Sequence, residues 1–181
     1  MRNKHIQALS EASLSVALSF VLSYLKIPIG LEFGGFGGSI DFVMVPLLLC
    51  GYRWGPGWGL GAGALLGTIK YFLAGGFALT WESMLLDYTL AYCAVGLCGL
   101  IRRKPKLAWL SALIGCSARF FIHFFSGITI YKAYMSDLFG LPMTNIWVYS
   151  ALYNGTYMLP NTVLAVALTA IICRLAPLEK T

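Results

Sequence analysis

Long apolar stretches, each about as long as a bilayer is thick, dominate this chain and constrain its fold more than any other feature. Of its 181 residues, 59% are hydrophobic and only 11% are charged, and the mean hydropathy is +0.76. This composition places the chain in the membrane class rather than the soluble globular class. A chain of this length holds roughly six spans of about 20 residues. We therefore predict one all-α integral membrane domain over residues 1–181, a bundle of six transmembrane helices with no soluble catalytic domain.

Glycines, prolines and charged residues separate the apolar stretches and set the expected helix limits. We predict helices over residues 6–25, 40–52, 57–74, 79–101, 107–130 and 146–175. Residues 26–39 are rich in glycine and are predicted to form an outer loop. The second helix is short for a span and contains Pro46. Pro160 should kink the sixth helix, because proline removes one helical hydrogen bond and clashes with the preceding turn.

Three glycines in the third predicted helix recur at a spacing of four residues. Gly59, Gly63 and Gly67 would let this helix approach a neighbour closely in lipid. A phosphate-cradling glycine loop, the functional alternative, would need a preceding strand and a final G-K-[ST], and the chain has no such sequence. The five cysteines lack C-x-x-C spacing. We therefore predict no ATPase activity, no metal site and no cofactor for this chain.

The distribution of basic residues predicts the orientation of the helices. The net charge is +6, and most of the positive side chains fall on the side of the predicted bundle that holds the N-terminus. By the positive-inside rule that side is cytoplasmic, which predicts both termini inside and an even number of spans. The basic residues on that side are Arg2, Lys4, Arg53, Arg102, Arg103, Lys104, Lys106, Arg174 and Lys180.

Polar side chains inside three different helices share one predicted depth. With a rise of 1.5 Å per residue, Asp87 and Asn154 lie roughly 12 Å below the outer surface and His123 roughly 10 Å below it. Ionisable groups at bilayer depth are costly and usually mark a substrate or ion pathway. We therefore expect Asp87, His123 and Asn154 to form one layer that binds a polar ligand from the outside.

Spacing along the fifth predicted helix extends this layer. Arg119, His123, Gly127 and Tyr131 lie four residues apart and form one stripe, in which Gly127 would leave space beside His123. Arg119 is expected to form a structural ion pair with an acidic partner, either Asp87 or Asp41. Catalysis by Asp87 with His123 is disfavoured, because no serine, cysteine or metal cluster completes such a site.

Aromatic residues at the outer ends of the helices allow two interpretations. Trp81, Trp147 and Tyr149 either belong to an interfacial aromatic belt or contact the ligand. The sequence alone leaves both interpretations open for each of the three.

Four segments resemble one known family over nearly the whole chain and in the same order. They are residues 37–46, 85–96, 119–127 and 149–160, and they include D-Y at Asp87, H-F-F-S-G at His123 and Y-x-x-x-Y-N from Tyr149 to Asn154. In combination these segments resemble the thiamine-specific S components (the ThiT/YuaJ family) of energy-coupling factor transporters. The resemblance implies a six-helix membrane bundle that holds the vitamin near the outer face. It also implies that the protein is a binding subunit rather than an enzyme.

The resemblance also implies which residues contact thiamine. The implied contacts are Asp87, Tyr88, His123, Tyr149 and Asn154, with Tyr131 as an aromatic that stacks on the ligand. Asp87 and Asp41 stand where some family members have glutamate, and Phe36 is the nearest aromatic to a tryptophan of the first outer loop that is missing here. The chemistry agrees, because a buried carboxylate and aromatic faces both attract a cationic thiazolium ring.

The resemblance further implies partners in the plasma membrane of a bacterium. A membrane T component and two cytoplasmic ATPases would supply the energy, and Ser13 and Ala17 on the first helix would dock on the T component. Ordinary packing of helices within the chain explains Ser13 and Ala17 equally well. Two other functions also stay open: an S component for another vitamin or a thiamine precursor, and a stand-alone ion-coupled transporter.

Overall fold

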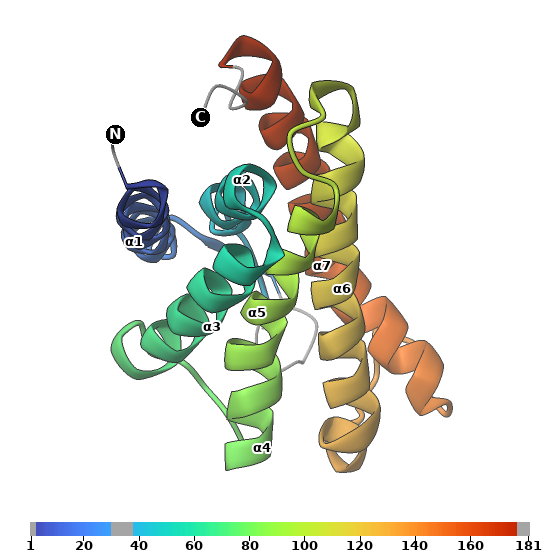
Figure 1. The fold of residues 1–181 in the computed structure, drawn as a ribbon. Helices are drawn as coiled ribbons and strands as arrows, with labels where there is room; N and C mark the ends of the chain where they lie inside the picture. The colour runs from blue at the N-terminus through green and yellow to red at the C-terminus, as the bar shows by residue number, and fades with distance from the viewer. Residues whose placement is uncertain (1–2, 30–37, 177–181) are drawn as a thin grey trace.

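The computed structural model describes residues 3–29 and 38–176 of the chain. Helices occur at each of the six predicted ranges (Figure 1). One of them is a composite helix, Trp81–Leu100, made of α4 (Trp81–Met84), the π-helical turn η2 (Leu85–Leu90), α5 (Ala91–Val95) and the 3₁₀ turn η3 (Gly96–Leu100). The other five are α1 (Lys4–Leu22), α2 (Met44–Trp54), α3 (Pro56–Leu73), α6 (Ala108–Thr129) and α7 (Ile146–Leu175).

Four of these helices are long and apolar enough to cross a membrane. Within the described residues they are α1, the composite helix, the segment Pro105–Thr129 and α7. The segment Pro105–Thr129 contains the short 3₁₀ turn η4 (Pro105–Leu107) and α6. Helix α2 has only 11 residues, about half of what a span needs. The chain is therefore an all-α membrane protein with one small hairpin, and the crossing of all six helices stays a prediction.

The first outer segment forms a hairpin rather than only a loop. The strands β1 (Ile27–Pro28) and β2 (Ser39–Ile40) pair antiparallel, with Ile27 opposite Ile40. Asn161 of α7 holds this hairpin in place: its side-chain oxygen accepts from Asp41 N–H at 2.8 Å, and its Nδ2 donates to Ser39 O at 2.6 Å. The second helix was predicted to begin at residue 40. Because Ser39–Ile40 is extended, α2 begins at Met44 instead.

The predicted glycine face of α3 is confirmed. A Cβ atom added at Gly63 would overlap the carbonyl oxygen of Tyr92, and one added at Gly67 would overlap that of Tyr88. A Cβ atom at Gly59 would lie 2.8 Å from the Cα atom of Gly96. These glycines let α3 pack directly on the backbone of the composite helix, as small residues do between helices in lipid.

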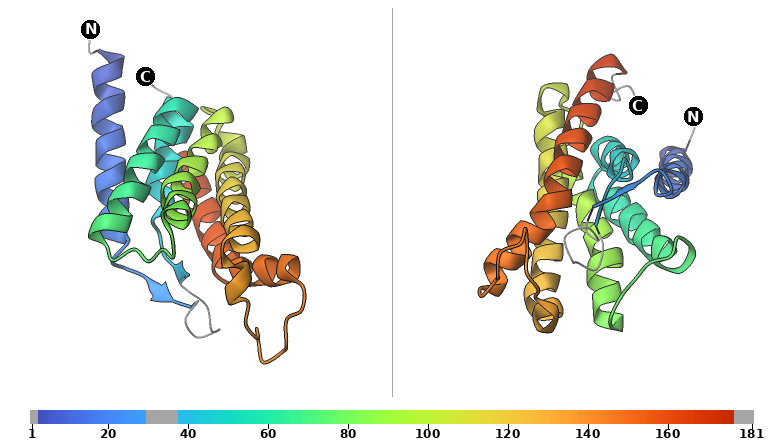
Figure 2. Two further views of the ribbon diagram at one scale, coloured as in Figure 1. Left: turned by 90° about the horizontal axis from the view of Figure 1, so that it is seen from below. Right: turned by 180° about the vertical axis from the view of Figure 1, so that it is seen from behind.

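The termini and the hairpin lie at opposite ends of the bundle. Figure 2 (left) shows the start of α1 and the end of α7 at one end, and the hairpin and the loop between α6 and α7 at the other. Helices α6 and α7 pack along each other, and α7 changes direction along its length, within a helix that contains Pro160 (Figure 2, right). The end with the hairpin also carries the candidate site. It is called the cavity end below, and the other is called the terminus end.

Candidate ligand-binding cavity

A cavity of about 550 Å³ opens at the cavity end, within the size range of small-molecule sites. Its walls come from β2, the end of α3, η2, α5, α6, η5 (Tyr131–Tyr134) and α7. Seven of the predicted ligand contacts line it, as does Arg119: Asp41, Asp87, Tyr88, His123, Tyr131, Tyr149 and Asn154. Sequence segments far apart in the chain thus meet around a single polar hollow.

The π-helical turn η2 places Asp87 and Tyr88 on the wall of this cavity. The turn covers Leu85–Leu90 and follows a capping box in which Thr80 and Ser83 bond to each other's backbone N–H groups. A π-helical turn adds one residue to a helical turn, and such turns often occur at functional sites. The phenol oxygen of Tyr88 accepts from Phe77 N–H at 2.7 Å, which ties the loop after α3 to this wall. The apolar pattern predicted an ordinary helix here, because a single π-turn of six residues is too short to change the periodicity of the sequence.

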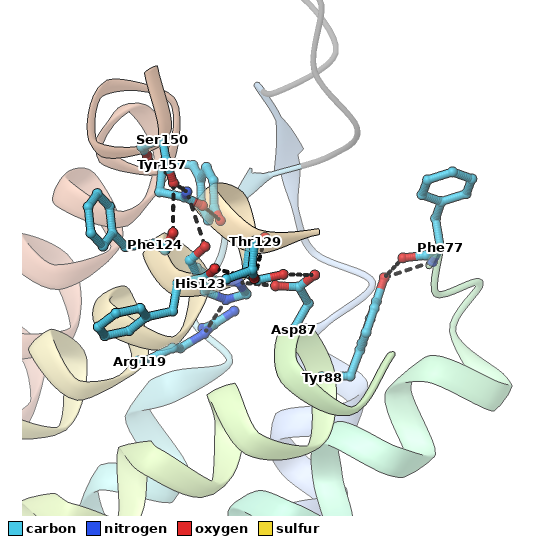
Figure 3. A network of polar contacts seen from close by, with 12 residues as sticks. Phe77, Asp87, Tyr88, Arg119, His123, Phe124, Thr129, Ser150 and Tyr157 are labelled. Carbon is cyan, nitrogen blue, oxygen red and sulfur yellow. Dashed lines mark hydrogen bonds and ion pairs between the residues drawn. The ribbon is translucent and has the colours of Figure 1, made fainter. Parts of the chain in front are cut away.

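Asp87 accepts hydrogen bonds from two side chains of α6. His123 Nδ1 lies 3.1 Å from Asp87 Oδ1, and Ser126 Oγ donates to Oδ2 at 2.9 Å. His123 Nε2 in turn accepts from Arg119 Nε–H at 3.4 Å. Figure 3 shows Asp87, His123 and Arg119 in this chain of contacts. Two residues of the predicted polar layer, Asp87 and His123, are thus in direct contact.

Arg119 does not form the predicted ion pair with Asp87 or Asp41. Asp87 contacts His123 instead, and Asp41 Oδ2 lies 3.7 Å from Lys70 Nζ. The Arg119 guanidinium lies with its Cζ atom 4.1 Å from the ring centroid of Tyr92. Its buried NH1 atom has no hydrogen-bond partner in the described part of the chain. A cation–π contact therefore replaces the expected carboxylate partner.

Asp41 belongs both to the hairpin and to the cavity. Its Oδ1 atom accepts from Val43 N–H at 3.1 Å, just before α2, and its Oδ2 atom accepts from Ser39 Oγ at 3.3 Å. Lys70, in the last turn of α3, donates to the Tyr92 phenol at 2.5 Å. The pair of Asp41 and Lys70 thus links the hairpin to α3 on one side of the cavity.

Three tyrosines of α7 form an aromatic wall. The rings of Tyr149 and Tyr153 are stacked with centroids 6.0 Å apart, and Tyr153 meets Tyr157 edge to face at 6.1 Å. Tyr157 also lies edge-on to the His123 ring at 6.0 Å. Tyr131, from η5, also lines the cavity, and burial raises the pKa of its phenol, with the Asp87 carboxylate raising it further. Electron-rich ring faces beside a carboxylate suit a cationic ligand.

Asn154 is held by neighbouring residues of α6 and α7. Its Nδ2 atom donates to Ser150 O at 2.9 Å and to His123 O at 3.4 Å, while its Oδ1 atom accepts from the Tyr157 hydroxyl at 2.6 Å. Gly127 lines the cavity, as predicted, but a Cβ atom there would overlap Ser150 Oγ. The glycine therefore also serves the close packing of α6 on α7.

One predicted contact, Trp147, does not lie on the described cavity wall. Trp147 is 57% exposed and packs on Phe124 at 5.9 Å, on the outside of the bundle and not among the cavity-lining residues. Phe36 lies outside the described residues. For Trp147 the placement matches the aromatic-belt interpretation.

Sequence reasoning missed many residues of the wall, and four of them carry polar groups that bear on the site. These four are Lys70, Tyr92, Ser126 and Tyr153. The sequence positions of Lys70 and Ser126 could have indicated a place on the wall. Lys70 lies at the outer end of its helix, and Ser126 lies three residues after His123 on the same face of α6. Tyr92 and Tyr153 gave no signal beyond their helical positions, since an inward-facing tyrosine and a lipid-facing one look alike in a single sequence.

The chain is similar to thiamine transporters over almost its whole length. The family model described as thiamine transporter protein (Thia_YuaJ) matches residues 9–180. The thiamine transporter ThiT of Bacillus subtilis is 27% identical over 194 residues, covering 97% of this chain and 95% of that protein. ThiT of Lacticaseibacillus paracasei is 26% identical over 192 residues, covering 97% and 91%. A solved structure of ThiT from Listeria monocytogenes shares the fold, with a TM-score of 0.83, 23% identity and 97% of each chain covered.

Proposed function

The chain belongs to the thiamine transporter protein family (Thia_YuaJ), and from this premise we propose that it binds thiamine in the cavity between η2, α6 and α7. It is a transport protein rather than an enzyme, as its relatives are. The binding step is the capture of the vitamin at the cavity end. One observation carries this proposal: a carboxylate, Asp87, lies on the wall of a 550 Å³ cavity that also has tyrosines on its walls.

The chemistry of these walls matches the two rings of thiamine. The thiazolium ring is cationic, so Asp87 offsets its charge and the Tyr149, Tyr153 and Tyr157 faces attract it. The aminopyrimidine ring needs directional hydrogen bonds. The side chains of Asp87, Asn154 and Tyr88 line the cavity and carry groups that form such bonds. His123 and Tyr131 complete the proposed contacts, while Asp41 acts from the hairpin.

Titration of the detergent-purified protein with thiamine tests this function. Binding is followed by calorimetry or by intrinsic tryptophan fluorescence. Asp87→Asn is expected to weaken binding at least about 30-fold, or about 2 kcal/mol, because hydrogen bonds and charge contacts to a partly buried carboxylate are lost. Asp137→Asn is the matched control, since Asp137 is exposed in the loop between α6 and α7. Unchanged binding by Asp87→Asn would refute the assigned role of this carboxylate.

A ligand panel separates thiamine from the nearest alternative. Riboflavin and the separate pyrimidine and thiazole precursors are titrated under the same conditions. The wild-type protein is expected to bind thiamine at least about tenfold more tightly than either precursor, because only thiamine occupies both kinds of contact at once. Tighter binding of another vitamin would keep the transport class and change the substrate.

We further propose six membrane-crossing helices with both termini in the bacterial cytoplasm. The termini lie at one end of the bundle (Figure 2). Three basic residues gather at that same end: Arg53 pairs with Glu11 at 3.3 Å, Arg103 donates to Arg53 O, and Arg102 donates to Trp54 O. Positive residues concentrate on cytoplasmic sides, and the cavity would then open outward, toward the vitamin supply.

Energy for release of the vitamin is proposed to come from an energy-coupling factor module of a T component and two ATPases. Ser13 and Ala17 are exposed on α1, whereas the buried residues of that helix are Ala8, Ala12, Val16 and Ser19. Ser13 also lines a small groove between α1 and α3. Small residues that face outward from a helix let a partner helix approach closely, which supports a docking role.

A double substitution tests this docking surface. Ser13→Trp with Ala17→Trp is expected to abolish uptake in cells, because bulk keeps the partner helix away, and to leave thiamine binding within about twofold. Leu14→Trp is the matched control on the same helix, since Leu14 is 67% exposed. Uptake by vesicles that contain this chain alone, driven by an ion gradient without ATP, would instead establish a stand-alone transporter.

A further inference from the structure

Arg119 lines the cavity and contacts the ring nitrogen of His123 opposite to the one that contacts Asp87, and its role is not explained by a charge partner. We propose that Arg119 is a positioning residue that keeps His123 uncharged, so that Asp87 presents its full negative charge to the ligand. This inference deepens the proposed function and rests on it. It concerns how the cavity stays attractive to a cation although a histidine lies next to its acidic group.

The hydrogen-bond directions define the state of the imidazole ring. A guanidinium group has only donors, so His123 Nε2 must accept the hydrogen bond from Arg119 Nε–H. An imidazole nitrogen that accepts carries no proton. The single ring proton therefore lies on Nδ1, from which it is donated to Asp87 Oδ1 at 3.1 Å. A doubly protonated ring would turn an N–H group against the N–H group of Arg119.

Arg119 is fixed in the place where it can do this. It lies four residues before His123 on α6, which puts both side chains on the same face of the helix. Its guanidinium is held over the Tyr92 ring at 4.1 Å, and the residue is only 7% exposed. Arginine stays protonated in proteins, so the charge beside His123 Nε2 is permanent.

Other charged and titratable groups around His123 also influence whether its ring is charged. Asp87 from η2 is its acidic contact, and Tyr157 from α7 lies edge-on to the ring. Lys70 from α3 adds a second positive charge near the ring, and its own acidic partner is Asp41. Tyr131 from η5 neighbours Asp87 rather than the imidazole. Two cations thus oppose a charge on His123, and one carboxylate favours it.

The consequence for the ligand concerns where charge is placed in the cavity. With a neutral imidazole, the unit of Asp87, His123 and Ser126 carries one negative charge, held by two neutral donors. With an imidazolium, the same unit would be neutral and would attract a thiazolium ring poorly. Arg119 therefore acts through His123, without requiring any contact of its own with the ligand.

Nitrogen NMR of ¹⁵N-histidine-labelled protein tests the charge state directly. The chain has two histidines, and His5 is exposed on the first turn of α1, so it serves as an internal reference. In the wild type we expect His123 to show one protonated and one bare nitrogen from about pH 8 to about pH 5.5. A doubly protonated His123 at about pH 7 in the wild-type protein would overturn the proposal without any variant.

Two variants separate positioning from simple structural support. Arg119→Met removes the donor and the charge, and is expected to let His123 take a second proton between about pH 8 and about pH 5.5. Arg119→Lys keeps both a donor and a charge and should restore the wild-type spectrum. A His123 spectrum in Arg119→Met that matches the wild type over this range would contradict the proposal.

Thiamine binding gives the second readout. We expect the affinity of Arg119→Met to fall about tenfold from about pH 8 to about pH 5.5, while the wild type and Arg119→Lys change less than twofold. The double variant Arg119→Met with His123→Gln should lose this pH dependence, because no group is left to titrate there. A wild-type protein that binds no thiamine would refute the proposed function, whereas the NMR result tests the inference independently.

Discussion

The terminus end and the cavity end of the bundle use the same helices in opposite ways. Toward the terminus end, Gly59 packs on Gly96, and Gly99 of the composite helix packs on Pro56. Neither Gly59 nor Gly99 has room for a Cβ atom. At the cavity end, the composite helix carries a π-helical turn and leaves a hollow of about 550 Å³. One helix thus serves as a close-packed support and as a binding wall.

The difference teaches how a small membrane protein builds a polar site. Charged groups are costly at bilayer depth unless they have partners. Both carboxylates that line the cavity contact a cationic or polar neighbour: Asp87 contacts His123, and Asp41 contacts Lys70. Toward the terminus end, glycine packing brings the helix backbones together, and the ion pair of Arg53 with Glu11 lies at that end. Substitutions at the glycine contacts between α3 and the composite helix, called the close-packed support below, are therefore expected to have the largest effect. Substitutions of exposed residues such as Trp147 at the outer ends of the helices, called the outer rim, are expected to have the smallest.

The largest expected effect is at the close-packed support. In Gly63→Leu the new side chain would overlap the Tyr92 carbonyl oxygen, which neither backbone can avoid. We expect a loss of more than about 3 kcal/mol in the free energy of unfolding, at the upper end of overpacking effects. Thermal unfolding in detergent measures it. Gly61→Leu is the matched control on α3, because nothing lies within 4 Å of a Cβ atom there, and it should change stability by less than about 0.5 kcal/mol. Equal stability of the two variants would mean that the support is not close-packed.

A smaller effect is expected where the hairpin is attached to α7. Asn161→Ala removes the acceptor for the buried Asp41 N–H and the donor to the partly buried Ser39 O, and leaves both backbone groups without these partners. We expect a loss of about 2 kcal/mol, seen as faster hydrogen exchange at the Asp41 amide. Thr156→Ala is the control on the same helix, since its hydroxyl donates to Tyr153 O within α7. If exchange at Asp41 stays slow in Asn161→Ala, the hairpin is held by other contacts.

The smallest effect is expected at the outer rim. Trp147→Phe changes a side chain that is 57% exposed and packs on Phe124 rather than on the cavity wall. Thiamine affinity should change less than about twofold, in line with a surface substitution. Fluorescence is unsuited to this variant, so calorimetry is the measurement. A loss of tenfold or more would mean that Trp147 reaches the ligand in the bound state.

Several features of the site could be predicted because they depend on position along a helix. The common depth of Asp87 and His123 follows from helix rise and from the expected span limits alone, and the structure places their side chains 3.1 Å apart. The glycine face of α3 follows from a spacing of four residues, and it packs as expected. Depth and face are fixed once a helix is recognised, whatever its neighbours are.

Partner choice could not be predicted in the same way. Arg119 was expected to pair with a carboxylate, but it contacts Tyr92 and His123 instead. Which side chains meet across a helix interface depends on how far each helix is rotated and tilted. Periodicity fixes neither quantity. The hairpin β1–β2 was missed for a similar reason, because strands of two residues each are too short to show alternation.

The sequence by itself determined the membrane class, the approximate helix ranges, the family and the shared level of Asp87 and His123 along their helices, since each of these depends on hydrophobicity, spacing or similarity along the chain. Only the tertiary structure decided that Asp87 lies on a π-helical turn, that Lys70 partners Asp41, and that Trp147 faces away from the cavity. These features come from contacts between segments far apart in sequence. Their free energies depend on distances and directions that a linear pattern does not contain.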